Sequence, residues 1–81
     1  MKPTHQSIGC AHPVTAWQFS HTAPIPVWVA RKFHRIEKTG WQGLGSKGEL
    51  VLAKPLDWAV LADSTIIVLT DSEFQMLFKP I

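Results

Sequence analysis

The single cysteine, Cys10, most constrains how this 81-residue chain can fold, because no disulfide can form within it. A chain of this size buries only about 60 to 65 % of its unfolded surface, so without a cross-link it needs a dense apolar core. The composition supplies one: 46 % of the residues are hydrophobic, including four tryptophans and four phenylalanines. The charged fraction of 17 % is also low for a disordered chain. We therefore predict a folded domain.

No segment of the sequence suits a membrane or an export signal. The longest uninterrupted apolar stretches, 58–62 and 66–69, are far shorter than the roughly 20 residues of a membrane-spanning helix. Residues 1–11 carry one lysine and lack the apolar segment of a signal peptide. A lone cysteine suits a reducing compartment. We expect a soluble cytoplasmic protein with no membrane partner.

Short β-rich runs, separated by prolines and glycines, dominate the pattern along the chain. In the first run, residues 13–19, β-branched and aromatic side chains alternate between two sides. This alternation predicts a strand with Val14 and Ala16 on one face, and with Trp17 and Phe19 on the other. Further strands are predicted at three places: 49–53, 58–62 and 66–69.

Turns are predicted where the apolar runs stop. Residues 63–65, Asp-Ser-Thr, join the last two strands in a hairpin pattern. Lys-Pro-Leu-Asp at 54–57 suits a turn with proline at its second position. Residues 39–48 hold four glycines and are expected to turn or loop, with room for a short strand around Trp41.

A first short helix is predicted from Pro26 to Arg35. Proline suits the first position of a helix, where its missing N–H costs nothing. Val29 and Phe33, four residues apart, would share an apolar face opposite a basic one. A strand over 27–30 is the alternative.

A second helix is predicted to begin at a capping box, Thr70-Asp71-Ser72-Glu73. In this motif the threonine side chain accepts from the glutamate N–H, and the glutamate side chain accepts from the threonine N–H. The helix should run from 71 to about 78, with Phe74, Leu77 and Phe78 facing the core, and should end before Pro80.

These elements together predict an α+β fold, a small antiparallel β-meander of three to four strands packed by two short helices. Residues 1–11 show no periodic pattern and are expected to form a flexible N-terminal tail. The remaining residues, 12–81, would form a single small domain.

Charge is distributed unevenly, although the net charge is only +2. Six basic residues and two acids lie between Arg31 and Lys54, whereas residues 55–78 hold four acids and no base. The pattern fits a basic face toward an anionic partner, or two halves that complement each other within the fold. A small basic nucleic-acid-binding protein, using segment 31–54 with Lys38, Lys47 and Lys54, is therefore the alternative function.

Two motifs could indicate bound phosphate or metal. Residues 43–48 match G-x-G-x-x-G, but the segment that follows is strand-like, so no helix N-terminus would face a phosphate. His5, Cys10 and His12 lack the paired short spacings of a zinc site. We expect a loop at the first motif and no metal at the second.

Two further sets of residues could indicate catalysis. Cys10 has histidines available as bases, but an activated nucleophile also needs a third, orienting group. Asp57 and Asp63 could pair as acid and base, yet both fall in predicted turns, where aspartate is favoured for its backbone hydrogen bonds. We expect a protein that is not an enzyme and needs no cofactor.

Tryptophans supply the candidate anchors for a partner. Trp17 and Trp58 lie on predicted strands and are expected in the core, whereas Trp28 and Trp41 are candidate surface anchors, because tryptophan is frequent at binding hot spots. Trp28 would share a helix face with two basic residues, a combination that also binds single-stranded nucleic acid. Packing of Trp28 beneath the sheet is the alternative. The candidate binding residues are Trp28, Arg31, Lys32, Arg35 and Trp41.

Three segments resemble a family of short phage and prophage proteins. Residues 12–19, His-Pro-Val-Thr-Ala-Trp-Gln-Phe, resemble the family's Lys-Pro-Val…Ala-x-Gln-Trp opening. Residues 54–60, Lys-Pro-Leu-Asp-Trp-Ala-Val, resemble its Pro-Gly-Asp-Trp/Tyr turn and strand. Residues 70–81 resemble its closing Ser-Asp-x-x-Phe-x-x-x-Tyr-Glu-Pro-Ile/Val.

The chain departs from this family pattern at four places. Leu56 stands where the family turn has glycine, so a positive φ is unfavourable and we expect a type I turn. His12, Phe78 and Lys79 replace the family's lysine, tyrosine and glutamate. The resemblance implies a small α+β fold from a mobile element and brings no catalytic residues. It leaves the function open. By analogy with small phage proteins that block host proteins, we expect a non-enzymatic accessory protein that binds a host or phage protein, in its sharpest form an inhibitor of a host defence system.

Overall fold

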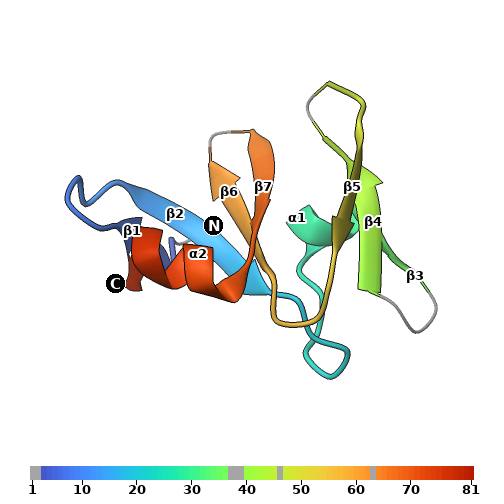
Figure 1. The fold of residues 1–81 in the computed structure, drawn as a ribbon, viewed down its shortest axis with the longest axis horizontal. Helices are drawn as coiled ribbons and strands as arrows, with labels where there is room; N and C mark the ends of the chain where they lie inside the picture. Colours follow the sequence, from blue (N-terminus) through green and yellow to red (C-terminus); the bar gives the residue numbers. More distant parts are fainter. Residues whose placement is uncertain (1–2, 37–39, 46, 63) are drawn as a thin grey trace.

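The computed structural model describes residues 3–36, 40–45, 47–62 and 64–81, which form two antiparallel sheets and two short helices (Figure 1). The larger sheet contains five strands: β1 (His5–Ser7), β2 (Pro13–Gln18), β6 (Trp58–Ala62), β7 (Thr65–Leu69) and β8 (Phe78–Pro80). The smaller sheet contains three: β3 (Phe33–Ile36), β4 (Gly40–Leu44) and β5 (Leu50–Ala53). The helices are α1 (Val27–Ala30) and α2 (Asp71–Leu77).

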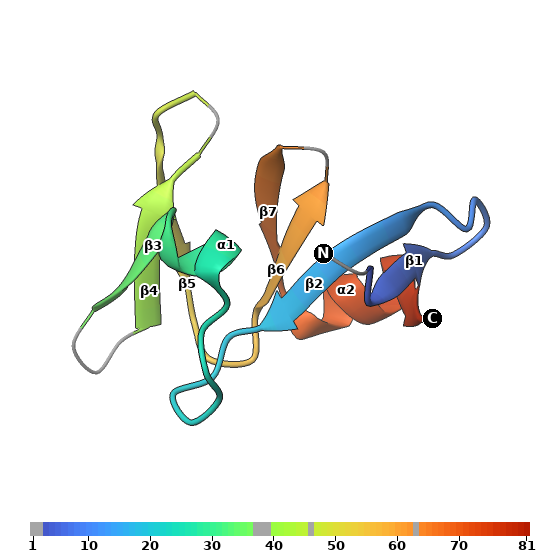
Figure 2. The same cartoon turned by 180° about the vertical axis from the view of Figure 1, so that it is seen from behind.

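This mostly β architecture corrects the predicted α+β meander of three to four strands. The larger sheet has the order β7-β6-β2-β1-β8, so its strands are not all neighbours in sequence. The smaller sheet, in the order β3-β4-β5, lies beside it as a second layer (Figure 2). The sequence pattern missed β1 and β8, strands of three residues that are too short to show a period of their own.

The predicted first helix is wrong beyond Ala30. α1 is a single turn, and the chain enters β3 at Phe33, where a helix was expected to continue to Arg35. The valines and tryptophan of this turn are weak helix formers, and its N-cap makes no side-chain hydrogen bond. Pairing of β3 with β4 supplies backbone hydrogen-bond partners on one side of the strand instead.

The glycines of β4 permit close approach of neighbouring strands. A Cβ on Gly43 would meet the Lys32 carbonyl and the Phe33 ring, and one on Gly40, at φ +137°, would meet the Ala53 carbonyl. Both positions therefore need glycine inside a strand. The turn predicted within 39–48 is present between Gly45 and Gly48, and the short strand allowed around Trp41 is confirmed as β4.

The larger sheet has an apolar cluster on each face. The first cluster fills the space between the two sheets and consists of Phe19, Val29, Phe33, Trp41, Ala53 and Ala59. The second cluster, Val14, Val60 and Phe74, lies between the larger sheet and α2. The predicted alternation of residues 13–19 is confirmed, because Val14 and Ala16 pack in the second cluster and Trp17 and Phe19 in the first.

The predicted capping box at α2 is confirmed. The Thr70 hydroxyl accepts from the Glu73 N–H at 3.2 Å, and Glu73 Oε1 accepts from the Thr70 N–H at 2.9 Å. Phe74 is buried and its ring stacks on Trp58 with 3.9 Å between centroids. Leu77, predicted to face the core, is instead exposed, and Phe78 begins β8 rather than ending the helix.

Two further expectations are changed by local pairing. Within residues 1–11, where a loose tail was expected, β1 instead pairs with both β2 and β8, placing His5 opposite Val14 and Pro80. The 54–57 turn closes through the Asp57 N–H and the Lys54 carbonyl, but Leu56 has φ +79°, as in a type II turn, so the expected type I turn is wrong. The predicted hairpin of β6 and β7 is confirmed.

Among the residues described, no helix has both the length and the apolar character that crossing a bilayer requires.

Candidate binding surface

Three leucines stand exposed on the face of the smaller sheet that is turned away from the first cluster. Leu44 and Leu50 lie directly opposite each other on β4 and β5, and Leu52 follows two residues along β5. Their exposed fractions are 66, 63 and 61 %. Because side chains alternate along a strand, the intervening Val51 and the following Ala53 point to the first cluster instead. We call Leu44, Leu50 and Leu52 the leucine face.

A polar pair borders the leucine face toward β3. Gln42 lies opposite Leu52 on one side and His34 on the other. The Gln42 amide Nε2 is 2.9 Å from His34 Nε2, so the amide N–H donates to the ring nitrogen. An apolar centre beside satisfied polar groups is typical of protein interfaces.

A groove between α1 and β2 brings two of the predicted binding residues together. This groove, the Trp28 groove, has a volume of about 640 Å³. Its lining includes Thr15, Trp17, Pro26, Val27, Trp28 and Arg31. Trp28 is half-buried and packs against the first cluster. Its burial is therefore intermediate between the two interpretations that the sequence allowed, a surface anchor and a core residue. Arg31 follows α1 as its C-cap and is exposed.

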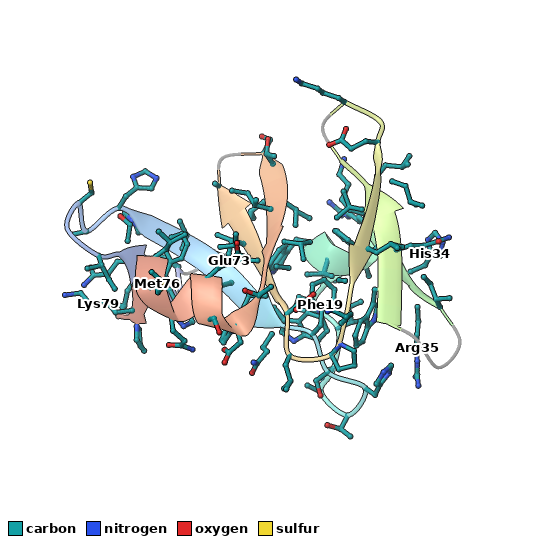
Figure 3. All side chains as sticks on the ribbon, in the orientation of Figure 1. Phe19, His34, Arg35, Glu73, Met76 and Lys79 are labelled. Carbon is teal, nitrogen blue, oxygen red and sulfur yellow. The ribbon has the colours of Figure 1, made fainter. Side chains whose placement is uncertain are left out.

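The other three predicted residues lie elsewhere. Lys32 is exposed and lines a small hollow between the β4 and β7 ends of the two sheets. Arg35 is exposed on β3. Figure 3 shows it at the end of the molecule away from α2. Trp41 is only 3 % exposed, which corrects its expected role as a surface anchor. The pairing of β4 with β3 and β5 directs the Trp41 side chain into the first cluster, and the sequence does not reveal this pairing.

The described basic side chains of segment 31–54 do not form one continuous basic surface. Arg31, Lys32 and Arg35 line three different hollows, and Lys47 and Lys54 are exposed beyond the two ends of β5. Lys38, which the basic-face hypothesis also used, lies outside the described residues.

The aspartate side chains with described hydrogen bonds stabilise the local structure around them. Asp57 Oδ2 accepts from the Lys54 N–H at 3.0 Å, which supports its interpretation as a turn residue; Asp63 lies outside the described residues. Asp71 Oδ1 accepts from the Trp58 indole N–H at 2.9 Å, and this bond lowers the pKa of the Asp71 carboxyl.

The histidine and cysteine candidates of the N-terminal segment have separate surroundings. His5 packs edge-on against Trp58 and Phe74, and burial lowers the pKa of its ring. Cys10 is exposed. In the part of the chain that the structure describes, no three metal-ligating side chains of the His, Cys, Asp or Glu type come together.

The glycine-rich motif at 43–48 runs from β4 through a turn into β5. The Gly45 and Gly48 backbones close this turn at 3.0 Å, and a strand rather than a helix follows, as expected; Ser46 lies outside the described residues.

Sequence reasoning missed the leucine face for one specific reason. The strand at 49–53 was predicted, but its uninterrupted apolar residues are typical of a strand covered on both faces. Recognising β4 as its partner would have shown Leu44 opposite Leu50, on the face that no other element covers in the described structure.

Comparison of the chain with protein-family models, with curated proteins and with solved structures gives no match.

Proposed function

We propose that this protein is a non-enzymatic binding protein that covers an apolar surface of another protein with its leucine face. The observation that carries the proposal is the exposure of Leu44, Leu50 and Leu52 side by side on a sheet. The largest exposed apolar patch of a monomeric protein is often an interaction site. A flat, regular sheet face also presents its side chains in fixed positions, which lowers the entropy cost of association.

The leucine face would supply part of the free energy of binding. Full burial of a leucine side chain contributes about 1.5 to 3 kcal/mol, so covering the exposed part of each would contribute about 1 to 2 kcal/mol. Three such residues supply about 3 to 6 kcal/mol towards an interface, before the costs of association. Neighbouring contacts from the polar pair Gln42 and His34 would fix the register of the partner.

The resemblance to short phage and prophage proteins supports a partner encoded by the host or the phage, in the bacterial cytoplasm. An inhibitor that occupies a surface of a host defence protein is the sharpest form of this proposal.

A second candidate, single-stranded nucleic-acid binding, is supported by the Trp28 groove. This groove sets the indole of Trp28 beside the exposed Arg31. Aromatic stacking combined with a cation is how such strands are held, and the affinity then falls steeply with salt.

Comparative capture from a host lysate tests the first candidate. Tagged wild type, a Leu44→Thr/Leu50→Thr/Leu52→Thr variant and a matched control are used with and without nuclease, at low and high salt. The control, Ile8→Thr/Met76→Thr/Ile81→Thr, removes three exposed apolar side chains, one from α2 and two from the residues that follow β1 and β8.

We expect one stoichiometric protein to survive nuclease and high salt on the wild type and on the control. Its affinity for the leucine variant should fall by at least about a hundredfold, since about 1.4 kcal/mol corresponds to a factor of ten. Equal capture by all three proteins would refute the leucine face. Capture that disappears with nuclease or salt would favour the nucleic-acid candidate.

A further inference from the structure

A hollow of about 310 Å³ lies beside Trp41, between the segment that follows β2 and strand β3. We call it the Trp41 hollow. Ser20 and His21 contribute from the connecting segment, and Phe33, His34 and Arg35 contribute from β3. It shares none of the three leucines with the leucine face, although His34 borders both sites. We propose that the Trp41 hollow binds a small phosphate monoester that carries a flat ring.

The polar groups of the Trp41 hollow suit an anion. Arg35 and two histidines line it, and its described lining contains no carboxylate. The arginine guanidinium presents a rigid fork of donors that matches phosphate oxygens. The His34 ring is held by Gln42 on the opposite face of β3, so Arg35 and His21 are the side chains that would meet the anion.

The stacked rings suit the flat part of the ligand. The His21 ring lies nearly parallel to the Trp41 indole, with 4.7 Å between centroids and an angle of 19°. Trp41 is buried beneath it, whereas His21 is exposed. A ligand ring in the hollow would contact this stacked pair, because both rings line it, while its phosphate reached Arg35.

The segment that holds His21 is braced by its own hydrogen bonds. Ser20 Oγ accepts from the Thr22 N–H at 3.1 Å and from the Ala23 N–H at 3.3 Å. The hollow is therefore largely formed before a ligand arrives. Its volume lies at the lower end of small-molecule pockets, about 300 to 1,000 Å³, which limits the ligand to roughly the size of one nucleotide.

Titration of adenosine 5′-monophosphate (AMP) into the full ¹⁵N-labelled chain tests the proposal. The four tryptophans give four indole N–H signals, and we expect the Trp41 signal to shift most. Adenosine and inorganic phosphate, each lacking one half of the ligand, should bind at least about tenfold more weakly. Arg35→Gln should weaken AMP binding by a similar factor. Arg31→Gln, which changes another exposed arginine that lies in the Trp28 groove, should leave AMP binding unchanged.

Three results would overturn the proposal. One is a dissociation constant for AMP above about 1 mM, weaker than about 4 kcal/mol of binding free energy. A second is an affinity for AMP that Arg35→Gln leaves unchanged. If Arg35→Gln does not fold, an affinity for AMP that His21→Ser leaves unchanged has the same consequence. The third is equally tight binding of a single-stranded DNA hexamer with a 5′-hydroxyl, because the contact would then not depend on a terminal phosphate ester.

Discussion

Replacement of the three leucines by threonine should cost this protein little stability. Between 61 and 66 % of each side chain is exposed, so only about a third of its burial energy is realised in the folded chain. A third of about 1.5 to 3 kcal/mol is about 0.5 to 1 kcal/mol for each residue, or about 1.5 to 3 kcal/mol for Leu44→Thr/Leu50→Thr/Leu52→Thr together. This sum is an upper bound, because unfolded chains already bury some apolar surface and threonine favours strands.

Urea unfolding followed by tryptophan fluorescence measures this difference directly. The folded state of an 81-residue domain is typically stable by about 4 to 12 kcal/mol, so the variant should remain folded with an unchanged dependence on urea. Three buried leucines would instead cost about 2 to 5 kcal/mol each. A total loss above about 5 kcal/mol, or an unfolded variant, would show that the leucines are core residues. The leucine face would then not exist as a free surface.

Three further predictions concern the second cluster and the helix that covers it. Phe74→Ala should destabilise the protein by about 3 to 5 kcal/mol in urea unfolding, because this buried ring stacks on Trp58; a loss below about 1 kcal/mol would contradict that packing. Thr70→Ala should cost about 1 kcal/mol, whereas Thr70→Ser should restore most of it. Burial lowers the pKa of the His5 ring in the folded protein. The contribution of His5 to the free energy of unfolding is therefore complete at pH values above the usual histidine pKa, and it is lost as the pH falls through the pKa in the folded state. The difference in unfolding free energy between wild type and His5→Gln should therefore narrow from about pH 8 to about pH 5, and a widening gap would refute this sign.

The elements that sequence reasoning found are those with a local signal. The alternation from Val14 to Phe19 and the capping box of Thr70 and Glu73 each depend on residues close in sequence. The hairpin of β6 and β7 likewise needs only its two strands and their short connection.

The elements that it missed depend on distant partners. β1 is three residues long and exists because β2 and β8 flank it. β3 replaces a predicted helix because β4 pairs with it, and β4 was obscured by glycines that serve close strand contacts. Leu56 adopts a positive φ in a turn whose backbone is held by Phe19, which overrides the local preference of leucine.

The binding residues divide in the same way. The sequence placed Trp28 and Arg31 together, and the structure does so in one groove. Trp41 was expected at the surface because its pairing with Ala53, and therefore its face, could not be seen locally. The leucine face needed the same register to be recognised.

Amide hydrogen exchange on the purified complex with the captured partner tests the central claim most directly. Binding through the leucine face predicts protection concentrated in β4 and β5, with the amides of α1 and α2 exchanging as in the free protein. Protection centred on the Trp28 groove or on α2, with β4 and β5 unchanged, would contradict it.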